Sequence, residues 1–142
     1  MQTTLPIIKE TFINAPAQKV WTALTKKEEM KQWYFDVSDF KPEPGVEFSF
    51  WGENEGRKYL HVCTIKEVIE AKKLSHTWTY EGYEGESLVA FELSEENGGT
   101  RVKLTHSGLE AFTHQHTDFA PSNFNMGWEH LIEKALKEYA EK

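Results

Sequence analysis

Histidine is the residue type in this chain best suited to acid–base or metal chemistry. His114, His116 and Asp118 stand at alternate positions in a segment without clear periodicity. If that segment were extended, all three side chains would face one way and could bind zinc. No cysteine or second acidic residue has the spacing of a further ligand. We therefore favour a polar loop with incidental histidines, and expect no metal and no cofactor.

Two other histidines fall in segments of alternating hydrophobicity. His76 precedes Trp78 by two residues and His106 follows Leu104 by two, so each is expected to face the protein interior. In a pocket, a neutral imidazole could orient a ligand hydroxyl or act as an acid or base. The alternative, which we favour, is a core histidine hydrogen-bonded to backbone or water. For His106 a further alternative is that it positions the chain where it leaves the sheet.

The sequence offers no other obvious catalytic group. Cys63 is the single cysteine, and no histidine is placed beside it by sequence to activate it. We expect it to be a small buried core residue. The chain also lacks a GxSxG nucleophile motif, a phosphate-binding loop and a dinucleotide fingerprint.

Composition narrows the partners and the compartment. The 142 residues carry 23 acidic against 16 basic side chains, a net charge of −7. Such a balance opposes binding to nucleic acid or to an anionic membrane, both of which need basic surfaces. Residues 1–9 have no basic stretch followed by an apolar run, so no signal peptide is expected. No apolar run has the length of a membrane helix. The single cysteine excludes an intramolecular disulfide. Together with the lack of a signal peptide and of a membrane helix, it predicts a cytoplasmic protein.

The elements that would position these residues begin with a strand over 4–13. Two short helices should follow. The first has an apolar face with helical spacing, made by Ala17, Val20, Trp21 and Leu24. Thr25 with Glu28 three residues later resembles a capping box that starts the second helix. The apolar side of that helix consists of Met30, Trp33 and Tyr34.

After Tyr34 the hydrophobic period changes from 3.6 to 2, which predicts strands. The first of these strands lies between a turn at 41–45 and another turn at 52–56. The hairpin signal Asn97-Gly98 lies between the last two. The candidate strands are 46–50, 59–69, 74–80, 89–93 and 102–106, and their close spacing favours an antiparallel sheet with one buried face.

A long amphipathic helix should end the chain after the irregular segment 108–121. Ser122 is a candidate N-cap. About 20 residues would span roughly 30 Å, enough to cross a curved sheet. Gly127 costs about 1 kcal/mol relative to alanine inside a helix, and we expect it to allow close packing on the sheet. The apolar arc consists of Phe124, Trp128, Leu131, Ile132, Ala135, Leu136 and Tyr139.

This order predicts one α+β domain over residues 1–142 with a helix-grip fold. In that fold a curved antiparallel sheet wraps around a long C-terminal helix, and two short helices follow the first strand. The 19 aromatic residues fit either a filled core or an aromatic-lined cavity. Large rings on both the sheet and the helix favour a void between them.

Several segments resemble one known family in content and order. They are FINAPAQKVWTALTKKEEMKQWY, KKLSHTWTY, NGGTRVKLTHSGL and GWEHLIEKAL. From about Ile7 to Tyr139, the chain resembles the Hsp90 ATPase activator homologue (AHSA1-like) domains of the START and Bet v 1-like (SRPBCC) superfamily. The resemblance implies the helix-grip fold. The resemblance says less about function, because relatives include lipid carriers, polyketide cyclases and antibiotic-sequestering proteins. The eukaryotic activator has an additional N-terminal domain without a counterpart in these residues, which argues against chaperone activation.

Three functional hypotheses follow. The first is binding of a hydrophobic aromatic or acyl molecule in a cavity between the sheet and the last helix. The second is a protein-interaction module, with a chaperone such as Hsp90 as a possible partner, which would have a filled core and an exposed patch. The third is a cyclase- or hydrolase-like enzyme that uses pocket histidines. The residues predicted to contact a ligand are Phe48, Phe50, Tyr59, His61, His76, Trp78, Phe91, His106, Trp128 and Leu131.

Overall fold

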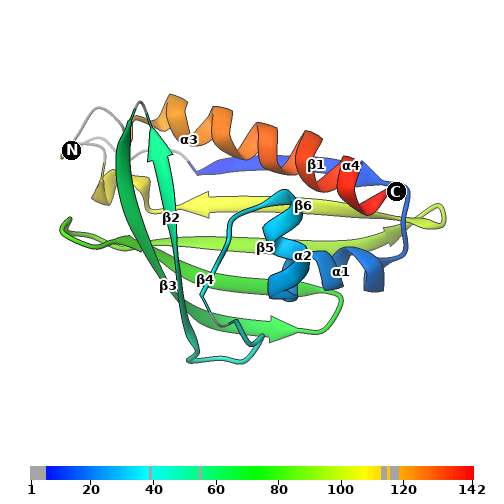
Figure 1. The fold of residues 1–142 in the computed structure, drawn as a ribbon. Coiled ribbons are helices and arrows are strands. Elements are labelled where there is room, and N and C mark those ends of the chain that lie inside the picture. The colour runs from blue at the N-terminus through cyan, green and yellow to red at the C-terminus, as the bar shows by residue number, and fades with distance from the viewer. Residues whose placement is uncertain (1–5, 39, 55, 113–114, 116–118) are drawn as a thin grey trace.

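The computed structural model describes residues 6–38, 40–54, 56–112, 115 and 119–142, and it has the helix-grip architecture (Figure 1). Six antiparallel strands form one curved sheet in the order β1-β6-β5-β4-β3-β2. The strands are β1 Ile7–Ile13, β2 Glu47–Asn54, β3 Arg57–Ile69, β4 Lys73–Tyr80, β5 Ser87–Glu96 and β6 Gly99–Ser107. The helical segments are α1 Ala17–Thr25, α2 Lys27–Trp33, η1 Leu109–Ala111, α3 Pro121–Trp128, η3 Glu129–Leu136 and α4 Lys137–Ala140. The predicted α+β helix-grip fold is confirmed.

The junction of the two short helices differs from the predicted capping box. The Thr25 hydroxyl donates to the Trp21 carbonyl (2.7 Å), so it bonds back into α1 instead of capping α2. Extended backbone at Lys26 separates the helices, and no side chain caps α2. The Trp33 indole donates to the Ala23 carbonyl (2.8 Å), which holds α2 against α1.

The predicted long helix is continuous from Pro121 to Ala140, with π-helical hydrogen bonding in its middle segment η3. Ser122 is not its N-cap. The helix begins two residues earlier than that cap implies, because Pro121 occupies the first helical position, where its missing N–H is no loss. Ala120 is the extended residue before it. Figure 1 shows the helix crossing the concave side of the sheet.

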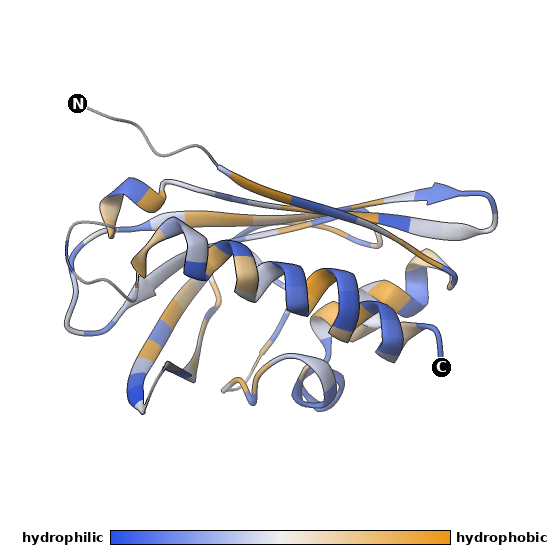
Figure 2. Cartoon of the chain, turned by 90° about the horizontal axis from the view of Figure 1, so that it is seen from above, coloured by the Kyte–Doolittle hydropathy of each residue, from blue (hydrophilic) through white to orange (hydrophobic). Residues whose placement is uncertain are grey.

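The buried face of this helix repeats every four residues. Its buried side chains are Phe124, Trp128, Ile132, Leu136 and Ala140. Leu131, Ala135 and Tyr139, predicted on the same arc, are only half-buried. A π-helical turn contains more residues than an α-helical turn, so positions four apart remain closer to one line. In Figure 2, hydrophobic and hydrophilic residues alternate within the turns of the helix, as expected for a helix with one buried face.

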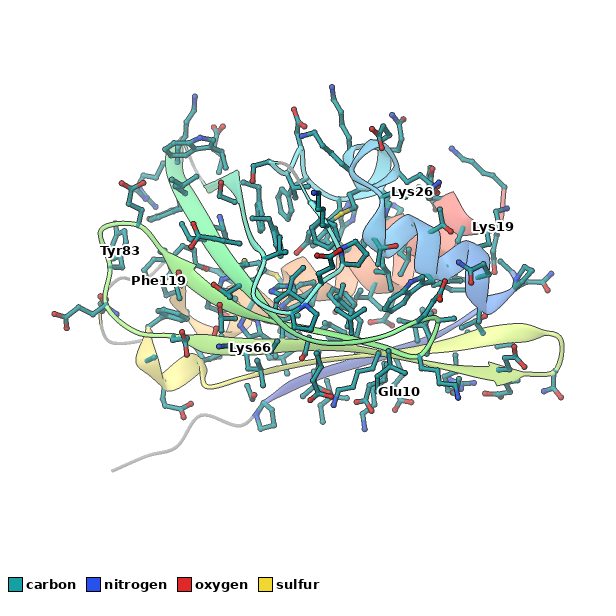
Figure 3. The ribbon with its side chains drawn as sticks, turned by 90° about the horizontal axis from the view of Figure 1, so that it is seen from below. Glu10, Lys19, Lys26, Lys66, Tyr83 and Phe119 are labelled. Carbon is teal, nitrogen blue, oxygen red and sulfur yellow. The ribbon has the colours of Figure 1, made fainter. Side chains whose placement is uncertain are left out.

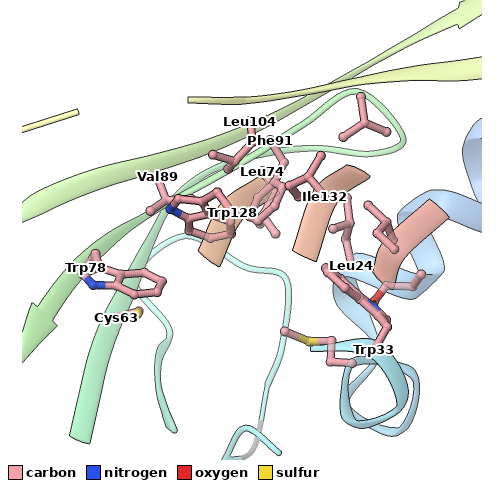
Figure 4. Packing of buried hydrophobic residues seen from close by; sticks show 14 of the residues in the cluster. Leu24, Trp33, Cys63, Leu74, Trp78, Val89, Phe91, Leu104, Trp128 and Ile132 are labelled. Atoms are coloured by element: carbon pink, nitrogen blue, oxygen red, sulfur yellow. The ribbon is translucent and has the colours of Figure 1, made fainter. Parts of the chain in front are cut away.

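The core lies between this helix, α1, α2 and the inner face of the sheet. Trp128 projects from the helix toward Val89 and Trp78, and Leu24 with Trp33 closes the other end (Figure 4). Complete burial of one large aliphatic or aromatic side chain stabilises a fold by about 1.5–3 kcal/mol. The outer face is polar where Glu10 and Lys66 lie exposed (Figure 3).

The Asn-Gly hairpin forms as predicted between β5 and β6. Asn97 and Gly98 both have positive φ, 48° and 81°, as a two-residue hairpin turn with the twist of the strands requires. Strand β2 is longer than expected, because it extends through Gly52 to Asn54, where a turn was predicted. No helix in the described part of the chain is long and apolar enough to cross a membrane.

Removing residues 128–142 should abolish folding. The deletion removes Trp128, Ile132 and Leu136, and it exposes the concave face of the sheet to water. We expect the truncated protein to show no cooperative thermal transition by circular dichroism, whereas the full chain melts cooperatively. A cooperative melt of the truncated protein would contradict the role assigned to the helix.

Candidate functional site

A cavity of about 310 Å³ lies between the first half of the long helix and strands β2, β3 and β4. The helix packs along β1, so the opposite half of the curved sheet rises beside it without direct cover. Met126, 62% exposed, stands at the rim of the opening. The lining residues are Phe35, Gly52, Glu53, Tyr59, His61, Trp78, Tyr80, Phe119, Asn123, Phe124, Met126, Gly127, Trp128 and Leu131.

Two glycines shape the cavity in different ways. A Cβ at Gly52 would lie 2.6 Å from the His61 ring, so the missing side chain lets that imidazole lie against strand β2. Around Gly127 a Cβ would meet nothing within 4 Å. The expectation that Gly127 allows close packing is therefore wrong. It lies on the wall of the cavity instead, where the absence of a side chain leaves room.

Aromatic rings form most of the wall. Trp78 and Trp128 meet with ring centroids 5.5 Å apart, one from the sheet and one from the helix. Phe119 stacks on Tyr80 at 4.5 Å and meets Tyr83 edge-on at 5.0 Å. Figure 3 shows Tyr83 and Phe119 side by side at the end of the sheet. The irregular segment before the last helix thus contributes Phe119 to the cavity.

Hydrogen bonds of the Gln115 side chain hold part of that segment against the turn between β4 and β5. The Gln115 side-chain oxygen accepts from the Glu84 backbone N–H (3.1 Å), while its amide donates to the Glu84 and Ala111 carbonyls. Gly85, at φ 104°, permits the approach, because a Cβ there would lie 2.7 Å from the Ala111 side chain. The end of the cavity near Phe119 is therefore anchored to the sheet by hydrogen bonds.

His106 joins the helix to the sheet through a buried chain of hydrogen bonds. The Trp128 indole N–H donates to His106 Nδ1 (2.9 Å), which requires the proton of the neutral ring to be on Nε2. That nitrogen then donates to Ser87 Oγ (2.7 Å), and the Ser87 hydroxyl donates to the Trp78 carbonyl (3.2 Å). Burial lowers the pKa of His106 to about 3, and His76 and His61 add to the effect.

The other two inward histidines are also neutral. His61 Nδ1 lies 3.1 Å from the Tyr59 carbonyl, and burial lowers the pKa of His61 to about 4. His76 Nδ1 lies 2.7 Å from the Thr77 carbonyl, and burial lowers its pKa to about 4 as well. In both, the carbonyl opposes the shift without overcoming it. Each imidazole therefore stays uncharged at neutral pH.

The structure brings half of the predicted ligand contacts to this cavity. Those that line it are Tyr59, His61, Trp78, Trp128 and Leu131. The other five do not. Phe48, His76 and Phe91 border a separate space of about 10 Å³, room for about one water. Phe50 stacks on His61 at 4.5 Å behind the wall, and His106 is fully buried behind Trp128.

Several lining residues were not predicted as ligand contacts. Tyr80 could have been, because it continues the inward alternation of Trp78 on the same strand. Phe35 lies outside the helices and strands and Phe119 lies in a 3₁₀ turn, so no apolar periodicity marks either residue. Cys63 is buried as expected, and burial raises the pKa of its thiol. The candidate zinc ligands His114, His116 and Asp118 lie outside the described residues. Within those residues no three metal-binding side chains come together.

Comparison with known proteins identifies the family. The family model described as "Activator of Hsp90 ATPase homolog 1-like protein" matches residues 14–141. The chain belongs to this family. Comparison with curated proteins gives no match.

Solved structures share the fold of this AHSA1-like chain over nearly its whole length. Protein BH1534 from Bacillus halodurans is 29% identical, with 99% of this chain and 100% of that chain covered and a TM-score of 0.74. Protein MLL2253 from Mesorhizobium loti is 26% identical over 95% and 96% of the two chains, with a TM-score of 0.76. The Aha1 dimer from Colwellia psychrerythraea is 24% identical over 97% of each chain, with a TM-score of 0.74.

The geometry of the AHSA1-like chain does not favour acid–base catalysis by histidine. Of the three inward histidines only His61 lines the cavity, and its pKa of about 4 leaves it a weak base. Effective general bases have pKa values near the working pH. His106 uses both ring nitrogens in structural hydrogen bonds. The predicted alternative of a core histidine with satisfied hydrogen bonds therefore describes His106.

The neutral histidines should make the protein acid-labile. In the unfolded chain they take up protons near pH 6.5, but in the folded protein only near pH 4 or 3. The unfolded state binds more protons between these values, so the free energy of unfolding falls as the pH falls from 6.5 toward 4. Each histidine contributes a slope of at most about 1.4 kcal/mol per pH unit.

Urea unfolding at a series of pH values measures that slope. His106→Gln should reduce the pH dependence of the free energy of unfolding by the contribution of one histidine, at most about 1.4 kcal/mol per pH unit. The variant should also be less stable at every pH. The exposed His130 provides the control, and His130→Gln should leave the slope unchanged. A stability that stays constant between pH 6.5 and 5 would contradict the buried neutral state of these residues.

Proposed function

We propose that this domain binds a hydrophobic small molecule in the cavity between the long helix and strands β2 to β4. One observation carries the proposal: a cleft of about 310 Å³, open to solvent on one side and walled largely by aromatic rings, beside an otherwise close-packed core. Ligand pockets typically measure about 300–1,000 Å³ and combine apolar walls with a few polar groups. Membership of the AHSA1-like family supports this, because folds of this type commonly bind hydrophobic ligands.

The wall also contains features that stability alone does not favour. Within the described residues, the Tyr34 hydroxyl is buried without a hydrogen-bond partner, and Trp78 Nε1 has at most a weak one in Tyr80. A buried unsatisfied polar atom costs about 1–3 kcal/mol. Trp78 lines the cavity, and Tyr34 stacks at 6.3 Å on Trp128, which also lines it. Gly127 adds the cost of glycine inside a helix. These costs are consistent with a wall shaped for binding.

The proposal also includes the domain organisation, the compartment and the partners of the chain. Residues 1–142 act as one START/Bet v 1-like domain in the cytoplasm, without a cofactor. The net charge of −7 supports a role that involves neither nucleic acid nor membrane. Native mass spectrometry of the purified protein would identify a ligand carried through purification.

Filling the cavity from Gly127 should block binding while the fold survives. The space around its Cβ position is open, so Gly127→Phe places a ring in the cavity without a clash at the backbone. We expect the affinity for an uncharged hydrophobic fluorophore such as Prodan, and the accompanying change in tryptophan emission, to fall at least about tenfold. Fluorescence titration measures both.

Gly127→Ala is the matched control. It should keep the affinity and stabilise the helix by about 1 kcal/mol, which raises the melting temperature by a few degrees. Equal binding to the wild type and both variants would show that the fluorophore binds elsewhere. If no hydrophobic probe binds the wild-type protein, the proposed function is wrong.

The alternative, a protein-interaction module, has one observation in its favour. Trp51 on the edge strand β2 is 62% exposed and lines a surface hollow with Lys58. Strand β2 is an edge strand whose outer backbone groups can pair with another chain, and tryptophan is a frequent anchor at protein interfaces. The similar protein from Colwellia psychrerythraea is described as a dimer, which makes a second copy one candidate partner. A chaperone partner remains a hypothesis without structural support in the described residues.

A further inference from the structure

Among the described residues, the lining of the cavity offers no positive charge to an anionic ligand. None of the lining residues identified in the described part of the chain is lysine or arginine. The one imidazole on the wall, His61, has no positive charge at neutral pH, because its carbonyl contact does not offset the cost of burial. A carboxylate placed among these rings would lose its hydration and gain at most neutral donors such as the Trp78 indole N–H, with no positive charge to pair with.

A buried cation would also lack an anionic partner. The single acidic lining residue, Glu53, lies at the exposed end of β2. Side chains alternate along this strand, with Phe48 and Phe50 buried and Trp51 exposed, so Glu53 belongs to the outward set with Trp51. In register it pairs with Lys58 across the edge of the sheet. An ammonium group inside the cavity would meet mainly ring faces, whose cation–π attraction offsets only part of its lost hydration.

The size of the cavity and its walls further restrict the ligand. A volume of about 310 Å³ is at the lower end of ligand pockets, so it suits a molecule of about two fused rings better than a long acyl chain. The two indoles of Trp78 and Trp128 lie at 57° to each other, with Tyr80 and Phe119 stacked beside them. Offset and edge-to-face contacts with these rings favour an aromatic guest.

We propose that the cavity selects an uncharged aromatic ligand and rejects carboxylates, fatty acids included. This inference rests on the proposed function and makes it more specific. A family of matched probes tests it: naphthalenemethanol, naphthylmethylammonium and naphthoate have the same ring system and differ in charge. At neutral pH we expect the alcohol to bind most tightly, the ammonium more weakly, and the carboxylate at least about tenfold more weakly than the alcohol.

A gain of function provides the stronger test. Leu131 is half-buried and lines the cavity, so the long side chain of Leu131→Arg can reach the cavity from the helix while it keeps contact with water. We expect this variant to bind naphthoate about tenfold more tightly than the wild type. Glu133→Gln, which changes the net charge by the same amount on an exposed helix position outside the cavity, should preserve the wild-type order of the probes.

The outcomes separate the two proposals. If the alcohol and the carboxylate bind the wild type equally, or the carboxylate binds best, charge selection is overturned while binding in the cavity stands. Unchanged naphthoate binding in a folded Leu131→Arg protein would also overturn charge selection. If none of the three probes binds and Gly127→Phe changes nothing, the proposed function fails and this inference fails with it.

Discussion

The hydrogen bond from the Trp128 indole to His106 determines how the long helix sits on the sheet. It is buried, and it joins the helix to β6 at the point where that strand ends. The same imidazole bonds to Ser87, whose hydroxyl bonds to the Trp78 carbonyl, so one chain of contacts crosses from helix to β6, β5 and β4. Because every donor in it has an acceptor, this polar chain can lie in the core without the cost of an unsatisfied group.

The position of the cavity follows from this connection. The helix is held over the β1, β6 and β5 half of the sheet, while β2, β3 and β4 curve beyond it (Figure 1). Helices α1 and α2 and the rings after them fill one end of the remaining space. At the other end Gly127 presents no side chain and the space stays open, while the His61 ring occupies the room left at Gly52. The cavity is thus a consequence of where the helix is anchored and of the missing side chain at Gly127.

The sequence predicts the framework of this protein better than its site. The change of period after Tyr34, the Asn97-Gly98 turn and the apolar arc of the last helix depend on local patterns, and the structure confirms them. The helix starts were less predictable: at Thr25 and Ser122 a competing backbone bond or a neighbouring proline decided the outcome.

Alternation along a strand shows which side chains face inward, but not whether the space above them is empty. Phe48 and Phe91 face the same side of the sheet as Trp78, yet they pack in the filled part of the core. Gly127 was misinterpreted for the same reason, since a glycine that permits contact and one that leaves a space are identical in sequence. Only the three-dimensional position of the helix separates these cases.

The neutral state of the histidines connects the fold to the kind of chemistry the cavity can support. Burial makes each imidazole a hydrogen-bonding group of fixed charge, and His106 uses both nitrogens to hold the helix. A protein that used these rings for proton transfer would need them near their ordinary pKa and exposed to substrate. Here the same burial that stabilises the anchor removes charge from the cavity wall. The wall can therefore recognise a ligand by shape and ring contact, and its polar groups serve to keep that shape.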